Sequence, residues 1–193
     1  IKIEHIRIDF TKYNPSFPEI WQEYTIGKKV QGAFHGIENV EIQNFVNTVF
    51  AKGETVKDQI SSAYNQGKDE KNNNQFYFDI GSNFFVEIAK LKAFRILWES
   101  KTGSTPFIFA NTTLQNKEED SPYNNILRTT TECMSAIFGG ANAIMVNSYN
   151  QSFEIPTKFS ERIARNQQTI LKKESYFDKV IDPTKGSYYV DYL

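Results

Sequence analysis

Apolar residues between positions 76 and 174 fall into two alternating patterns. Short apolar or aromatic runs predict strands, and longer stretches with apolar residues every three or four positions predict helices. The predicted strands are 76–80, 106–110 and 143–146, and the predicted helices are 84–99, 122–138 and 157–174. Because connections of helical length separate the strands, the strands must run parallel and be joined by right-handed crossovers.

The stretch 122–147 is the clearest of these helix-to-strand units. A polar residue before Pro122 can accept the free N–H groups of the first turn, and Pro122 itself needs no donor there. Gly139-Gly140 can turn left-handed and end the helix. The following strand delivers Asn147 at its carboxyl end, where parallel sheets carry their sites. The predicted buried stripe of the helix is Ile126, Leu127, Thr130, Met134 and Ile137.

The first 75 residues carry weaker patterns. Alternating apolar and polar residues predict a strand at 3–10, whereas no clear period organises 11–29, which is expected to be a loop. Apolar spacing predicts a helix through 40–49 that ends near Gly53, followed by a second helix at 55–65. The polar run 66–75 is expected to be a surface loop.

Counting the first strand, four βα units are visible, and 193 residues favour a single domain. Such units can form an open doubly wound sheet or roughly the C-terminal half of a (β/α)8 TIM barrel. The spacing does not choose between them. The first residue is not Met, and the chain stops just after an apolar pattern, so we expect a fragment of a longer protein.

Composition narrows the partners and the compartment. Lys and Arg number 22 against 23 acids, so a net charge of −1 offers no global field for nucleic acid or for an anionic membrane. A single cysteine excludes an internal disulfide, and the N-terminus lacks a secretory apolar segment. No apolar run approaches the roughly 20 residues that span a bilayer. The expected location is the cytoplasm.

Few residues suggest catalysis or ligand binding. No glycine-rich phosphate loop and no Cys or His cluster with metal spacing occurs. His5 and His35 lie in the least organised third of the chain, and Cys133 has apolar neighbours typical of a packed thiol. The run 111–116 holds only neutral hydrogen-bonding groups. The run 182–187 is a turn or a phosphate contact, and the cations of the last helix are expected to form a solvated face.

From residue 75 onward, the sequence closely resembles the methylmalonyl-CoA mutase family of acyl-CoA mutases, whereas residues 1–74 match only loosely. The stretches that carry the resemblance are Asp79 to Trp98 (DIGSNFFVEIAKLKAFRILW), Pro122 to Ala136 (PYNNILRTTTECMSA), Phe159 to Gln168 (FSERIARNQQ) and Asp182 to Val190 (DPTKGSYYV). The resemblance implies a (β/α)8 barrel, of which this chain is roughly the second half. Catalytic members bind adenosylcobalamin at the C-terminal face and act as isomerases.

The sequence departs from the catalytic pattern on the strand before Pro122. Catalytic members carry Arg-Thr-His-Ser-Gln there, and the counterpart here is Phe107-Ile-Phe-Ala-Asn111. Residues of one parity share a face of a strand, so Phe107, Phe109 and Asn111 would replace three polar groups. The resemblance therefore implies a barrel interior filled by aromatic rings.

A second departure follows the next strand. Catalytic members carry Asn-Ser-x-Asp-Glu, whereas Asn150 and Gln151 replace both acids here and Asn147 is kept. Asn111, Asn147 and Gln151 are thus expected as degenerate cofactor-contacting positions, with no catalytic residue and no metal ligand. The family's cobalamin-binding domain is not in this chain, so we expect the chain to bind no cofactor.

These departures resemble the family's small subunits, which keep the barrel and pair with a catalytic large subunit. The expected role is that of a non-catalytic small-subunit fragment in a heterodimer that interconverts methylmalonyl-CoA and succinyl-CoA. Its expected partner is the large subunit or the missing half of the barrel. Two alternatives stay open: the C-terminal half of an active mutase barrel, and a stand-alone α/β binding module.

Overall fold

The computed structural model, which describes residues 5–9, 31–35, 45–68 and 74–193, contains one six-stranded sheet. Each strand pairs in parallel with the next strand along the chain. The strands are β1 His5–Asp9, β2 Gln31–His35, β3 Phe45–Phe50, β4 Asn74–Ile80, β5 Phe107–Thr112 and β6 Ala143–Met145. The helices are α2 Val56–Lys68, α3 Phe84–Thr102, α4 Asn124–Phe138, α5 Lys158–Lys173, the 3-10 helix η2 Phe177–Lys179 and α6 Tyr188–Tyr192.

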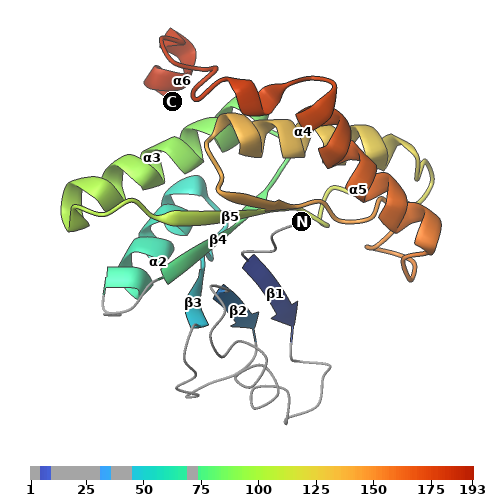
Figure 1. Ribbon diagram of the computed structural model, residues 1–193, viewed down its shortest axis with the longest axis horizontal. Helices are drawn as coiled ribbons and strands as arrows, with labels where there is room; N and C mark the ends of the chain where they lie inside the picture. The colour runs from blue at the N-terminus through green and yellow to red at the C-terminus, as the bar shows by residue number, and fades with distance from the viewer. Residues whose placement is uncertain (1–4, 10–30, 36–44, 69–73) are drawn as a thin grey trace.

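The strand order decides between the two architectures that the sequence left open. In a doubly wound sheet the order reverses at a switch point, whereas here it runs without reversal from β1 to β6. Right-handed crossovers in a sequential sheet place successive helices on the same side. Figure 1 shows α3 and α4 over one face of β4 and β5. The fold is therefore α/β and is consistent with part of a TIM barrel.

The main hydrophobic core lies between this face of the sheet and the helices. Phe76 and Phe78 of β4 have 1% and 0% exposure, and they pair in register with Ile108 and Ala110 of β5. The ring of Phe94, from α3, lies 4.8 Å from that of Phe76 and 4.9 Å from that of Phe78. Burying each of these rings contributes roughly 1.5–3 kcal/mol. Apolar spacing along α3 predicts a buried stripe of Phe84, Ile88, Leu91, Phe94 and Trp98. The last four are buried, which confirms the period, whereas Phe84 is half-buried.

The sequence signals for helix ends were right at Thr157 and at Gly140 and wrong at the start of α4. Thr157 caps α5 in a capping box with Ser160. Gly103 and Gly140 adopt left-handed conformations after α3 and α4, with φ of 70° and 80°. At the start of α4, however, the N-cap is Tyr123, and no side chain caps the helix.

The predicted buried stripe of α4 was partly wrong. Leu127 is 67% exposed, while Asn125, Thr129 and Glu132 are buried with exposures of 0%, 0% and 1%. The helix turns a polar stripe inward because these side chains find hydrogen-bond partners there, as described below. Hydrophobic periodicity cannot detect a face that is buried through polar contacts.

The predicted helix at 40–49 was wrong over the residues that the structure describes, since Phe45–Phe50 forms β3. Val49 and Phe50 pair in register with Phe76 and Tyr77 of β4, and the β-branched, aromatic composition suits this pairing. The predicted loop at 66–75 was also too long, because α2 continues to Lys68 and β4 begins at Asn74. β1 confirms the first predicted strand, whereas β2 was not predicted. The predicted loop at 11–29 lies outside the described residues.

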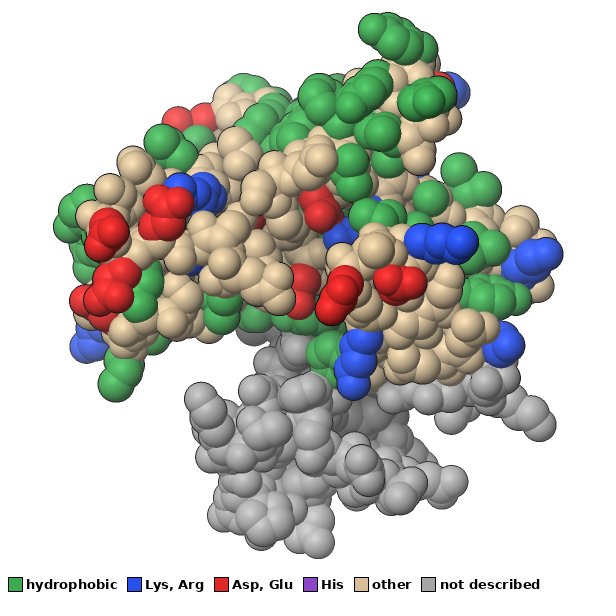
Figure 2. Space-filling model, turned by 180° about the vertical axis from the view of Figure 1, so that it is seen from behind, with side chains coloured by type: hydrophobic (Ala, Val, Ile, Leu, Met, Phe, Trp, Pro, Cys, Tyr) green, Lys and Arg blue, Asp and Glu red, His purple; other side chains and the backbone are tan. Residues whose placement is uncertain are grey.

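The C-terminal segment packs on the outer side of α3. Val190 of α6 is buried beside Ile88 and Ala89, and Lys92 Nζ lies 2.8 and 3.0 Å from the two carboxylate oxygens of Asp182. This hydrogen bond lowers the pKa of Asp182, and the same carboxylate accepts a hydrogen bond from the Thr184 amide. The run at 182–187 is therefore a structural turn. Figure 2 shows hydrophobic side chains gathered over this end of the chain, which includes the exposed Tyr188, Tyr192 and Leu193.

Candidate functional site at the carboxyl ends of the strands

The face of the sheet that points away from the helices carries side chains in layers. The register aligns Gln75 with Phe107, Tyr77 with Phe109, and Asp79 with Asn111. Since Phe76 and Phe78 face the helices, these odd-numbered residues share the opposite face, which becomes the interior in a barrel. Phe107, Phe109 and Asn111 thus lie on one face.

The middle layer of this face is aromatic. The ring of Tyr77 stacks on that of Phe109 with centroids 5.7 Å apart and 14° between the planes. The ring of Phe50, from β3, lies 5.0 Å from that of Tyr77 on the other side. Three adjacent strands therefore present a continuous row of rings across the centre of this face.

Asn111 lies above the aromatic layer, near the carboxyl ends of the strands. Its Nδ2 donates a 2.8 Å hydrogen bond to Asp79 Oδ1 on β4. Its Oδ1 is buried and has no hydrogen-bond partner among the described residues. Asp79 is exposed. The side-chain amide of Asn111 is therefore held by one oxygen of a solvent-accessible carboxylate.

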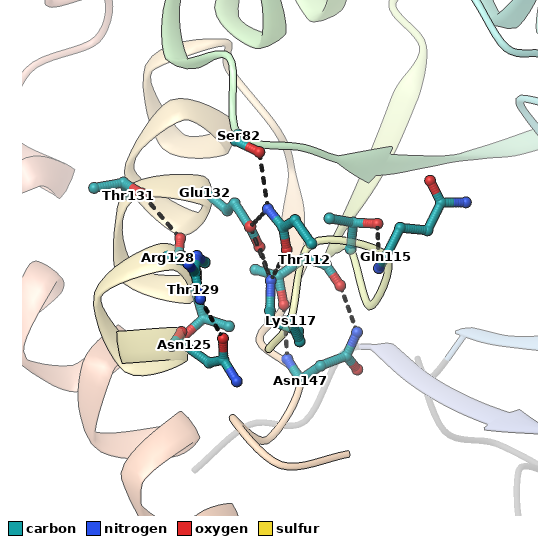
Figure 3. Close-up of polar contacts among 12 residues, drawn as sticks. Ser82, Thr112, Gln115, Lys117, Asn125, Arg128, Thr129, Thr131, Glu132 and Asn147 are labelled. Atoms are coloured by element: carbon teal, nitrogen blue, oxygen red, sulfur yellow. Dashed lines mark hydrogen bonds and ion pairs between the residues drawn. The ribbon is translucent and has the colours of Figure 1, made fainter. Parts of the chain in front are cut away.

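Asn147 follows β6 and is 5% exposed. Its backbone N–H donates to Thr112 Oγ1 at 2.9 Å, and its Nδ2 donates to the Thr112 carbonyl at 2.5 Å. Figure 3 shows both contacts between the end of β5 and the segment after β6. The amide donors of Asn147 thus tie two neighbouring strand ends together.

Gln151 lies in the turn after Asn147 and is exposed. Its Oε1 accepts a 3.3 Å hydrogen bond from the Ser148 amide, while the neighbouring Asn150 donates to Glu154. Among the described residues, no hydrogen bond joins Asn111, Asn147 and Gln151 to one another. Asn111 and Asn147 instead join neighbouring strands, and Gln151 stabilises its own turn.

An ion pair that the sequence analysis missed lies beneath the loop after β5. Lys117 Nζ contacts Glu132 Oε1 at 2.9 Å, and both side chains are completely buried. Asn116 Nδ2 donates to the same carboxylate at 2.6 Å and to Ser82 Oγ at 3.0 Å. Figure 3 shows Lys117 and Glu132 turned toward each other below Ser82. Burial raises the pKa of Glu132 and lowers that of Lys117, and the hydrogen bond between them opposes both shifts. The sequence signal that could have revealed this pair was the position of Glu132, an acid that lies between positions 129 and 133 of α4, both of which are buried.

Asn125 fastens the same loop to α4. Its Oδ1 accepts from the Glu118 amide at 3.0 Å and from Arg128 at 2.7 Å. Its Nδ2 donates to the carbonyls of Glu118 at 2.8 Å and Tyr149 at 3.0 Å. Arg128 also pairs with the Glu118 carboxylate at 2.8 Å. The oxygen and the nitrogen of the Asn125 side chain each make two hydrogen bonds, so this residue holds the loops after β5 and β6 to α4.

The chemistry available at this edge is hydrogen bonding and ion pairing. Burial raises the pKa of the Cys133 thiol to about 12, so this cysteine stays protonated and is a poor nucleophile. His5 lies on β1 and His35 on β2, and their side chains are outside the described part of the chain. Within the described residues, no group of three or more His, Cys, Asp or Glu side chains is placed to hold a metal ion. No described helix is long and apolar enough to cross a membrane.

Comparison with known proteins places the chain in a family. The family model described as methylmalonyl-CoA mutase matches residues 69–193. The chain is 46% identical over 127 residues to a methylmalonyl-CoA mutase of Rhizobium meliloti, which covers 61% of this chain and 18% of that protein. It is 41% identical over 128 residues to the mitochondrial methylmalonyl-CoA mutase of Homo sapiens, which covers 61% of this chain and 17% of that protein.

A longer match is to the methylmalonyl-CoA mutase small subunit of Porphyromonas gingivalis. The two sequences are 40% identical over 153 residues, and the match covers 74% of this chain and 25% of the small subunit. The chain thus spans a quarter or less of the length of these relatives. The family model matches well over half of the chain, over the same strands and helices that build the sheet edge described above. The chain belongs to the methylmalonyl-CoA mutase family.

Proposed function

We propose that this chain is part of a methylmalonyl-CoA mutase small subunit, a non-catalytic barrel that supports a catalytic large subunit in interconverting methylmalonyl-CoA and succinyl-CoA. The observation that carries the proposal is the engagement of the amides at the strand ends. The Nδ2 of Asn147 is bound to the Thr112 carbonyl, and the Nδ2 of Asn111 is bound to Asp79. Each of these nitrogens thus makes a hydrogen bond within the protein.

The aromatic layer supports the same proposal. Phe107 and Phe109 occupy positions where the resemblance implies polar groups, and Phe109 stacks with Tyr77. An adenosyl group needs hydrogen-bonding partners for its ribose, and Asn150 and Gln151 stand here where the resemblance implies acids. The residues present therefore do not fit adenosylcobalamin, and no reaction step is assigned to this chain.

The extent of the similarity also favours a small subunit. The match to the P. gingivalis small subunit covers 74% of the chain, whereas the matches to the R. meliloti and human mutases cover 61%. We further propose a cytoplasmic location, since a chain with a single cysteine can form no internal disulfide.

The proposal is tested by titrating the purified full-length protein with adenosylcobalamin and following the corrin absorption. We expect no spectral change from the protein alone, together with formation of a stable complex with a separately purified catalytic mutase subunit. Tight cobalamin binding by the protein alone would contradict the proposal. Turnover of methylmalonyl-CoA without any partner would favour the alternative, in which the chain is the C-terminal half of an active barrel.

A further inference from the structure

We draw no further inference here: the strongest candidate, the surface patch of exposed aromatic side chains that Tyr188, Tyr189 and Tyr192 of α6 form beside Phe85 of α3, carries nothing, because nothing in the structure shows what covers it.

Discussion

The two faces of β4 place alternate residues of one strand in different environments. Phe76, Phe78 and Ile80 are at most 1% exposed and pack against helices, whereas Tyr77 is half-buried and Asp79 is exposed on the other face. The helix-facing side of β4 is apolar, as a parallel sheet that packs against helices requires. The opposite side carries Gln75, Tyr77 and Asp79, which line up with Phe107, Phe109 and Asn111 of β5. The difference teaches that strand parity separates the residues that pack the core from those available for a site.

The largest effect is expected on the helix-facing side. Phe78→Ala removes a fully buried ring beside Phe94 and should lower the free energy of unfolding by about 4 kcal/mol, since Phe→Ala cavities cost about 3–5 kcal/mol. Its neighbour on the other face provides the control. Asp79→Asn keeps an oxygen that can accept from Asn111 and should cost less than about 1 kcal/mol. Urea unfolding of the full-length protein measures both, and equal costs would contradict the separation of the two faces.

The buried ion pair should rank next. Lys117→Met leaves the Glu132 carboxylate buried with only Asn116 as a described donor, and we expect a loss of about 3 kcal/mol at neutral pH. Lys172→Met, at an exposed position of α5, should change stability by less than about 0.5 kcal/mol.

The stability of the Lys117→Met variant should depend on pH in a defined direction. Burial already raises the pKa of Glu132 above its ordinary value of 4.5, and removing Lys117 raises it further. A carboxyl whose pKa is higher in the folded state contributes stability below its unfolded pKa and loses that stability as pH rises through its folded pKa. The deficit of Lys117→Met relative to wild type should therefore shrink as pH falls from 7 toward 4.5. A deficit that stays constant over this range would contradict the assignment, as would failure of the added Glu132→Gln change to recover stability.

A smaller effect is expected at the strand ends. Asn147→Ala removes the hydrogen bond from Nδ2 to the Thr112 carbonyl but keeps the backbone N–H contact to Thr112 Oγ1, and it should cost about 1–2 kcal/mol. Formation of the complex with the catalytic subunit should persist. Asn166→Ala, at an exposed position of α5, is the matched control and should be close to neutral. A variant that keeps full stability but changes cobalamin affinity would show that Asn147 contacts the cofactor.

The smallest effect is expected at Gln151. This side chain is exposed, so Gln151→Glu should change stability by less than about 0.5 kcal/mol. The substitution supplies the carboxylate that the resemblance assigns to catalytic members. We expect no corrin absorption change on adding adenosylcobalamin, since the Asn147 amide stays bound to Thr112. If this single variant bound cobalamin, the missing acid at position 151, and not the aromatic layer of the sheet, would be what prevents binding.

Much of the fold could be predicted from the chain because its elements are locally encoded. The strand–helix alternation after residue 75, the α3 stripe, the Thr157 cap and the turn at Gly140 all depend on neighbours within a few residues. The parity of Phe107, Phe109 and Asn111 is equally local, since alternation along a strand needs no tertiary information. By contrast, β3 was mistaken for a helix because its apolar spacing suits both structures and only pairing with β4 decides.

The sequence by itself determined the α/β class, the family and the shared face of Phe107, Phe109 and Asn111. Only the tertiary structure decided the sequential strand order, which favours part of a barrel over a doubly wound sheet. It also decided that Asn111 pairs with Asp79 across 32 positions, Asn147 with Thr112 across 35, and Lys117 with Glu132 across 15. The physical reason is that a hydrogen bond or buried ion pair forms between groups that the fold brings together, and the spacing of residues along the chain does not encode such a meeting.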